Sequence, residues 1–202
     1  TGDGEVDQTL IDDIPDEQPD DAEAKDLAAG LLGFQLDENG DPVYQAGSWS
    51  QWGGTSYRNN VPVGADIPTS WAVGSFDRRS GEWNSEGAEN IKWVARVGSQ
   101  TYGNPVVAGG RVFVGTNNSA GYLPRYPARV DLGCMLCFSE KDGSLLWQHS
   151  SEKLSTGRVH DWPLQGICCA PLVEGDRLWF VSSRGEVICV DTEGYYDGED
   201  DG

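Results

Sequence analysis

The stretch that decides the fold occurs twice, first as Asn104-Pro-Val-Val-Ala-Gly-Gly-Arg-Val-Phe-Val-Gly-Thr116 and then as Ala170-Pro-Leu-Val-Glu-Gly-Asp-Arg-Leu-Trp-Phe-Val-Ser182. The proline, the first glycine and the arginine align between the copies, and the apolar pattern is kept. Each copy is followed by a second strand-like stretch, 133–138 and 185–190, in which Cys137 aligns with Cys189. Self-similarity at a fixed period is the signature of a repeat fold.

Short strands are predicted on both sides of tight turns. The turns are Ala108–Gly110, Glu174–Asp176 and Lys141–Gly143, and each contains a glycine of the kind that hairpin turns favour. Strands of four to seven residues are typical of one blade of a β-propeller. The expected strands are residues 91–97, 104–107, 111–116, 134–139, 144–149, 170–173, 177–182 and 186–191.

Charge is distributed unevenly along the 202 residues, whose net charge is -19. Residues 1–48 carry fourteen acidic residues and one basic residue, and residues 191–202 carry six acidic residues and none that is basic. Residues 49–190 carry thirteen of each. The acidity therefore belongs to the ends of the sequence. We expect no nucleic-acid partner, because nucleic acid selects basic patches, and no membrane span, because no stretch is long and apolar enough.

Four segments are predicted. Residues 1–48 form an acidic, disordered leader, with a short amphipathic helix over Asp20–Leu32. Residues 49–90 form an aromatic, Gly-rich lead-in that is ordered but irregular, residues 91–194 carry the repeats, and residues 195–202 form an acidic tail or a truncated loop. The start of the chain resembles a spacer behind a cleaved export signal. This resemblance predicts an extracytoplasmic protein, either periplasmic or secreted.

The stretch Glu140-Lys-Asp-Gly-Ser-Leu-Leu-Trp147, a turn followed by a Trp-bearing strand, resembles the end of a blade in the pyrroloquinoline-quinone-type (PQQ-like) propeller repeat. Trp93 stands where the preceding blade would place the same tryptophan. The lead-in from Trp49 to Asn60, followed by 67–71, resembles the opening of exported propeller proteins of planctomycete-type bacteria. The resemblance covers roughly residues 49–194. It implies an all-β fold, a partial propeller of about two four-stranded blades plus a leading strand.

A propeller ring needs about four to eight blades, so we expect that this sequence is a fragment of a longer protein, with completion by partner chains as the alternative. The family includes quinoprotein dehydrogenases and non-enzymatic propellers of outer-membrane assembly. The resemblance therefore implies three functions. We favour a non-enzymatic scaffold or interaction module. The first alternative is a PQQ-dependent alcohol or sugar dehydrogenase that uses PQQ with calcium. The second is a structural component of an extracytoplasmic assembly, with envelope proteins as partners.

Five cysteines are an odd number, so at least one thiol is free or binds something. Cys137 and Cys189 share one repeat position, which predicts that both are reduced, buried core residues. The disulfide candidates are Cys134, Cys168 and Cys169, because an exported protein meets an oxidising environment. A bridge from Cys134 to Cys168 or Cys169 is preferred over the vicinal pair.

The PQQ-like resemblance gives the vicinal cysteines a second interpretation. In related quinone-dependent dehydrogenases a vicinal disulfide lies against the cofactor, so the candidate cofactor-binding residues are Cys168, Cys169 and Trp162. The simpler interpretation is that one thiol faces the core and the other faces solvent, since neighbours on a strand face opposite sides. No metal site is the main expectation, but a zinc site of Cys134, Cys168, Cys169 and His160 remains an alternative.

The loop Gly157-Arg-Val-His-Asp-Trp-Pro163 lies between the two copies and could bind an anionic or planar ligand. Its simpler interpretation is a structural crossover, in which His160 makes a structural hydrogen bond. The insertion Asn117–Leu132 belongs to the same question, because long insertions at one end of a repeat commonly form the functional face. The candidate ligand-binding residues are Arg158, His160, Asp161, Tyr122 and Arg125.

Overall fold

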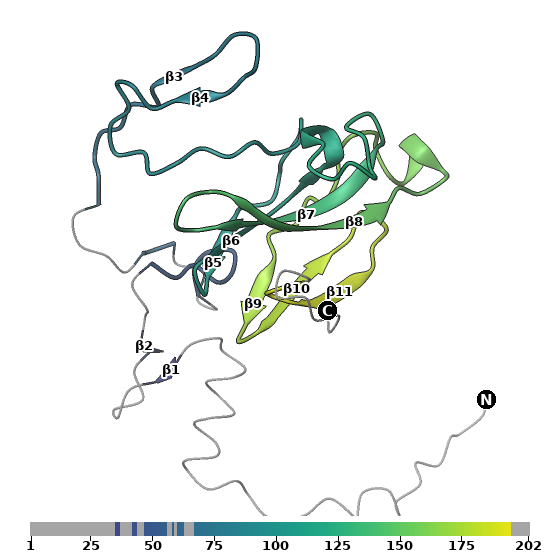
Figure 1. Ribbon diagram of the computed structural model, residues 1–202. Helices are drawn as coiled ribbons and strands as arrows, with labels where there is room; N and C mark the ends of the chain where they lie inside the picture. Colours follow the sequence, from purple (N-terminus) through teal and green to yellow (C-terminus); the bar gives the residue numbers. More distant parts are fainter. Residues whose placement is uncertain are drawn as a thin grey trace, which may run out of the picture.

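The computed structural model describes residues 35–36, 42–43, 47–55, 58, 60–62 and 67–194, and within them the protein is all-β. Its two larger sheets are antiparallel, with strand orders β5-β6-β7-β8 and β11-β10-β9. Figure 1 shows these sheets next to each other, with the small β3–β4 hairpin set apart from both. The strands are β1 (Gln35–Leu36), β2 (Pro42–Val43), β3 (Ser75–Phe76), β4 (Trp83–Asn84), β5 (Val106–Ala108), β6 (Arg111–Asn117), β7 (Leu132–Ser139), β8 (Leu145–Glu152), β9 (Leu172–Glu174), β10 (Arg177–Val181) and β11 (Val187–Asp191).

The three-stranded sheet repeats the register of the four-stranded one. Phe113 of β6 pairs with Cys137 of β7, and the aligned Trp179 of β10 pairs with Cys189 of β11. The alignment made from the sequence is therefore confirmed, with β9, β10 and β11 equivalent to β5, β6 and β7. The expectation of two four-stranded sheets holds only for the first, because no equivalent of β8 occurs among the described residues.

The predicted hairpin turns are confirmed. Gly109 and Gly110 join β5 to β6 with φ values of 56° and 75°, which is the sign that a type I′ turn requires at both central residues. Gly175 joins β9 to β10 with a φ of 60°. Gly143 closes the turn before β8, where its amide donates to the carbonyl of Ser139 at 2.8 Å.

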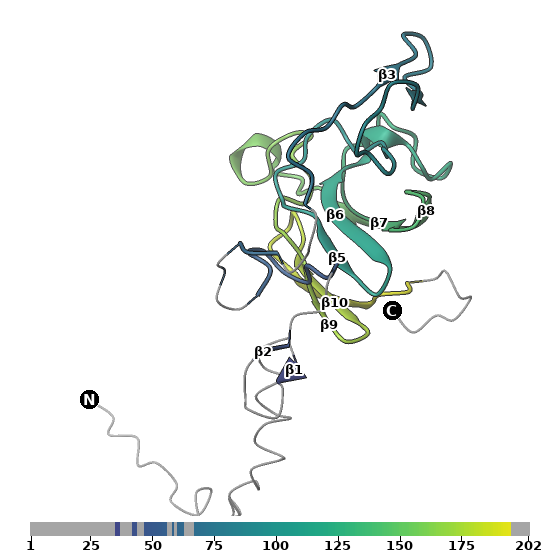
Figure 2. The same cartoon turned by 90° about the vertical axis from the view of Figure 1, so that its left-hand side faces the viewer.

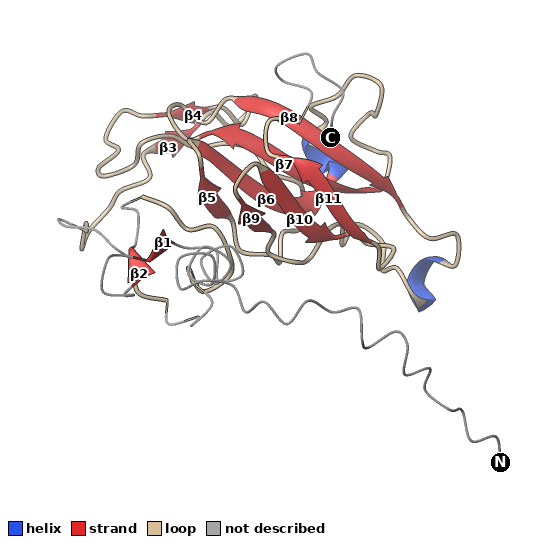
Figure 3. Cartoon of the chain, turned by 90° about the horizontal axis from the view of Figure 1, so that it is seen from below, coloured by secondary structure: helices blue, strands red, loops and turns tan. Residues whose placement is uncertain are grey.

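Apolar side chains fill both faces of the four-stranded sheet, in keeping with the alternation of a strand. The central core lies between the two larger sheets and joins side chains of both, namely Val106, Phe113, Met135, Cys137, Trp147, Ile167, Val173, Leu178 and Phe180. The outer core lies on the opposite face of the four-stranded sheet and consists of Val114, Leu132, Cys134, Leu136 and Phe138. Figure 3 shows the strands of the two larger sheets running in similar directions when seen from below.

Two tryptophans, Trp93 and Trp147, make the same kind of contact with a glycine turn. The Trp93 indole donates from Nε1 to the carbonyl of Glu140 at 2.8 Å, and it lies so close to Gly143 that a Cβ there would be 2.5 Å from the ring. Trp147 donates in the same way to Thr192 at 3.0 Å, and a Cβ on Gly194 would be 2.8 Å from its ring. Each tryptophan thus docks on a glycine turn that ends the third strand of a sheet.

Two segments differ from expectation. Residues 91–97 were expected to form a strand, but they pair with no strand among the described residues. Their side chains nevertheless alternate between half-buried and exposed from 91 to 96, so an extended segment is present without a sheet. The lead-in 49–90, expected to be irregular, contains the β3–β4 hairpin, which Figure 2 shows projecting from the body.

Several expectations fall on other parts of the chain. The predicted helix over Asp20–Leu32, most of the leader 1–48 and the tail 195–202 lie outside the described residues. In the part of the chain that the structure describes, no helix has the length and apolarity that crossing a membrane requires.

Candidate functional site

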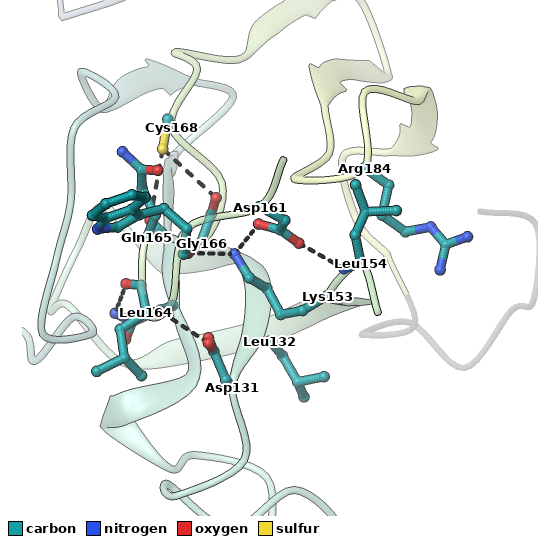
Figure 4. A network of polar contacts seen from close by, with 12 residues as sticks. Asp131, Leu132, Lys153, Leu154, Asp161, Leu164, Gln165, Gly166, Cys168 and Arg184 are labelled. Atoms are coloured by element: carbon teal, nitrogen blue, oxygen red, sulfur yellow. Dashed lines mark hydrogen bonds and ion pairs between the residues drawn. The ribbon is translucent and has the colours of Figure 1, made fainter. Parts of the chain in front are cut away.

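The loop between β8 and β9 is braced by a buried ion pair. Asp161 is only 6% exposed. Its Oδ2 accepts a hydrogen bond from the amide of Leu154 at 2.7 Å, and its Oδ1 pairs with the Lys153 ammonium. Lys153 also donates to the carbonyl of Trp162 at 3.1 Å. Figure 4 shows the carboxylate of Asp161 pointing between Lys153 and Leu154. These contacts hold the loop against the end of β8.

A second brace joins the same loop to the insertion and to β6. Leu164 has a φ of 61°, and its amide donates to Oδ2 of Asp131 at 2.9 Å. Its carbonyl accepts from the side-chain amide of Asn117. Farther along, the amide of Ile167 donates to the carbonyl of Thr116 at 3.1 Å, which anchors the fully buried Ile167 in the central core.

The result is a loop whose polarity is inverted. Two of its charged side chains, Lys153 and Asp161, face inward, whereas three of its apolar side chains face outward. Val159 is 75% exposed, Trp162 58% and Leu164 41%. Large exposed apolar side chains, tryptophan above all, are of the kind that dominates protein-binding surfaces. We call the side chains of Val159, Trp162 and Leu164 the apolar tip.

The two vicinal cysteines face different partners. The Cys168 thiol is exposed and lies 3.6 Å from the carbonyl oxygens of Gln165 and Gly166. The Cys169 sulfur instead accepts from the amide of Val181 at 3.2 Å and packs against the central core. The arrangement follows the simpler sequence interpretation, one thiol outward and one inward. The two thiols do not form one platform for a planar cofactor such as PQQ.

The structure holds all five thiols free. Cys134 belongs to the outer core, where Gln148 donates to its sulfur at 3.3 Å, whereas Cys169 lies on the central-core side of the same sheet. The predicted bridge between Cys134 and Cys168 or Cys169 is therefore not formed. Cys134 and Cys137 do face opposite sides of β7, as expected. Among the described residues no group of three or more metal-ligating side chains gathers, so the zinc alternative gains no support.

The remaining candidate ligand residues divide between structural and exposed positions. Tyr122 donates its hydroxyl to the carbonyl of Arg96 at 2.7 Å and packs edge-on against Phe138. The Arg125 guanidinium lies 5.0 Å from the ring centre of Tyr126. His160 is exposed and lies beside Asp161 in sequence without pairing with it. The side chain of Arg158 lies outside the described residues.

The residues that organise this face were largely missed by sequence reasoning. Thr116, Asn117 and Asn118, at the end of β6, are each at most 2% exposed. Asn118 donates to three carbonyls of the insertion, those of Tyr126, Pro127 and Val130, at 3.0–3.1 Å. The sequence did contain a signal for these residues, a run of three polar side chains at the end of a buried strand. Polar side chains in such a place are buried only when they are hydrogen-bonded.

No protein-family model matches the sequence, and no curated protein matches it significantly. The functional argument therefore depends on the geometry of the described residues.

Proposed function

We propose that the chain is a segment of an exported, PQQ-like β-propeller that serves as a non-enzymatic scaffold or interaction module. The propeller part of the proposal is supported by the repeated contact in which Trp93 docks on Gly143 and Trp147 docks on Gly194. Successive sheets that carry the same contact in the same register are what a blade repeat requires.

The observation that carries the functional part is the inverted polarity of the loop. A ligand-binding loop would present its charges to solvent, but here the charges of Lys153 and Asp161 are paired with each other and buried. The side chains of the apolar tip are exposed instead. Tryptophan is enriched among residues that dominate protein interfaces, and Trp162 stands on a backbone that is already fixed, which lowers the entropy cost of binding. The loop therefore suits a protein partner, such as another component of an envelope assembly.

A site-specific crosslink tests this proposal. A photoreactive amino acid is placed at Trp162 in the full chain, in the cells that naturally produce it, with the exposed turn residue Asp176 as the matched control position. We expect a discrete protein adduct at Trp162 and none at Asp176. Recovery of uncrosslinked chain alone, or of the same adducts from both positions, would contradict a specific protein-binding loop.

The dehydrogenase alternative makes a different prediction. If Cys168, Cys169 and Trp162 held PQQ beside calcium, adding both to the protein would raise its melting temperature and give the absorbance of bound cofactor. The separate directions of the two thiols give no support to this alternative. A saturable shift with PQQ and calcium together, absent with calcium alone, would favour the enzyme over the scaffold.

A further inference from the structure

The middle of the chain contains a stretch in which every charged residue is basic. Residues 91–130 carry five basic side chains and no acidic one, although residues 49–190 as a whole carry thirteen of each. Arg111 is the only one of the five that enters an ion pair among the described residues, with Glu193 at 2.6 Å. The other four are exposed and take part in none of the ion pairs found there. They are Lys92, Arg96, Arg125 and Arg129.

Two segments bring these four side chains to one side of the four-stranded sheet. Residues 91–97 and the insertion both cover its outer core, through Ala95 from the first segment and through Tyr122 and Tyr126 from the second. The Tyr122 hydroxyl also donates to the carbonyl of Arg96 at 2.7 Å, which joins the two segments directly. We call the side chains of Lys92, Arg96, Arg125 and Arg129 the basic face.

The backbone of each segment turns these charges toward solvent. In residues 91–96 the odd-numbered side chains are half-buried and the even-numbered ones are exposed. Lys92 and Arg96 therefore lie on the same, outward side of an extended chain. In the insertion, two successive turns are each closed by a backbone hydrogen bond, and Arg125 and Arg129 occupy the third position of each turn.

The contacts that these side chains make leave their charge unpaired. The Arg96 guanidinium donates to a backbone carbonyl of the β3–β4 hairpin at 3.2 Å, and that of Arg125 lies over a tyrosine ring. Neither contact brings a negative charge. Asp131, close by in sequence, turns its carboxylate toward the β8–β9 loop, where it accepts from the amide of Leu164. A surface with several unpaired arginines suits carboxylates, which guanidinium groups bind through paired hydrogen bonds.

The chain itself carries the complementary charge. Residues 12–26 of the acidic leader contain eight acidic side chains and one basic side chain. The leader is followed directly by Trp49, which pairs with Val107 of β5 in the four-stranded sheet. We propose that the acidic side chains of residues 12–26 bind the basic face of the same chain.

This contact regulates access to the basic face. A single exposed ion pair contributes little, but covalent linkage supplies the leader at an effective concentration of about a millimolar, and several pairs act at once. Another acidic partner must therefore compete with the leader for the same arginines. The contact needs charge and no particular leader conformation, so it weakens with salt. It is independent of the apolar tip, because the two surfaces share no residue.

Zero-length coupling of the full 202-residue chain tests the contact. A carbodiimide joins a lysine amine to a carboxylate only when the two groups are in contact, and Lys92 is the lysine of the basic face. We expect peptide mass mapping to find Lys92 joined to acidic residues of 12–26. In a mixture of natural and isotope-labelled chains, both peptides of each joined pair should carry the same isotope. Salt at about 1 M, which screens charges beyond about 3 Å, should abolish the coupling.

Neutral variants supply the matched control. Arg125→Gln with Arg129→Gln removes two charges of the basic face without adding a carboxylate, and it should lower the coupling yield at Lys92 about fivefold. Arg177→Gln with Arg184→Gln removes two exposed charges on and beside β10 and should leave the yield unchanged. The inference is overturned if Lys92 joins no leader residue, if all three proteins give equal yields, or if coupling occurs only between different copies.

Arginine side-chain NMR gives a second measurement without a crosslinker. When the eight acidic residues of 12–26 are replaced by Asn and Gln, the Nε–H signals of Arg125 and Arg129 should shift, and those of Arg177 and Arg184 should not. Unchanged signals from all four would contradict the contact. Flotation with vesicles that contain an anionic phospholipid tests a membrane surface instead. Vesicle binding that requires Arg125 and Arg129, without coupling of Lys92 to the leader, would assign the face to lipid and overturn the proposal.

Discussion

At the scale of single residues, burial separates the five thiols. Cys134 and Cys137 are fully buried, and removal from water raises the pKa of each thiol to about 12. Burial also raises the pKa of Cys168, while the nearby Lys153 lowers it, but this thiol is exposed. The thiolate is the reactive form, so access and ionisation both favour reaction at Cys168 over the two core thiols.

Alkylation of the native protein near neutral pH should therefore modify Cys168 first, and it should reach Cys134 and Cys137 only when the protein unfolds. Peptide mass mapping after timed alkylation measures this order. Unfolding in denaturant before alkylation is the control that should label all five. Fast native labelling of Cys137 would show that the central core is open to solvent.

The two histidines differ in the same way. His149 is half-buried, its Nε2 lies 3.1 Å from the Ser151 hydroxyl, and its ring packs edge-on against Phe180 at 5.3 Å. Burial lowers the pKa of this imidazole from its ordinary 6.5. His160 is exposed, so His160→Gln serves as a matched control for His149→Gln.

We predict that the His149 contribution to stability is complete above pH 6.5 and is lost as the pH falls from there toward the lowered folded pKa. In that window the unfolded chain binds a proton that the folded chain excludes, and the slope is at most about 1.4 kcal/mol per pH unit. Denaturant unfolding at several pH values measures this. The slope should flatten in His149→Gln and persist in His160→Gln, and equal slopes in all three proteins would contradict the assignment.

At the scale of elements, each tryptophan dock depends on a glycine for two reasons. Gly194 has a φ of 57° and Gly143 has a φ of 73°, a region that costs other residues about 1–2 kcal/mol. A Cβ at either position would also meet an indole ring at 2.5–2.8 Å. Gly175 separates the two effects, because its φ is 60° but a Cβ there meets nothing within 4 Å.

Gly194→Ala and Gly143→Ala should therefore lower the free energy of unfolding more than Gly175→Ala does, by about a further 1–3 kcal/mol for the overpacked contact. Denaturant unfolding of the three variants checks this, and tryptophan fluorescence reports the displaced indole. If all three variants lose the same stability, the docks contribute nothing beyond backbone strain, and the support for a propeller repeat fails.

The sequence predicted features that depend on residues close together in the chain, and it missed features that depend on contacts between distant residues. The glycine turns were predictable, because they join strands that are neighbours in the sequence, and so was the equivalence of Cys137 and Cys189. The pairing of Phe113 with Cys137 was not predicted, because an insertion separates β6 from β7. Residues 91–97 carry strand residues, but a strand also needs an adjacent strand, which sequence alone does not supply. Asp161 and His160 were candidate ligand-binding residues, and the simpler interpretation made their loop a structural crossover. Asp161 is buried with Lys153, a pairing that depends on how the loop folds back.

At the scale of the whole molecule, the two larger sheets share one core. Phe113 and Met135 of the first sheet are buried together with Leu178 and Phe180 of the second. The Arg111 guanidinium of β6 also pairs with Glu193, just after β11, at 2.6 Å. Neither sheet buries its facing side chains alone, so we expect the two sheets to unfold as one cooperative unit.

Leu178→Ala tests this cooperativity across the sheet boundary. Leu178 is fully buried in β10, and its truncation should cost about 2–5 kcal/mol. If the sheets unfold together, the slowest-exchanging amides of β7 in the other sheet should lose the same free energy in native-state hydrogen exchange. Val187→Ala is in the same sheet but 74% exposed. It should change the free energy of unfolding and the protection of β7 by no more than about 0.5 kcal/mol each. Unchanged protection of β7 in Leu178→Ala would mean that the four-stranded sheet is stable alone. The shared core would then be a contact between independent units, as in a linear repeat array where each sheet can open separately.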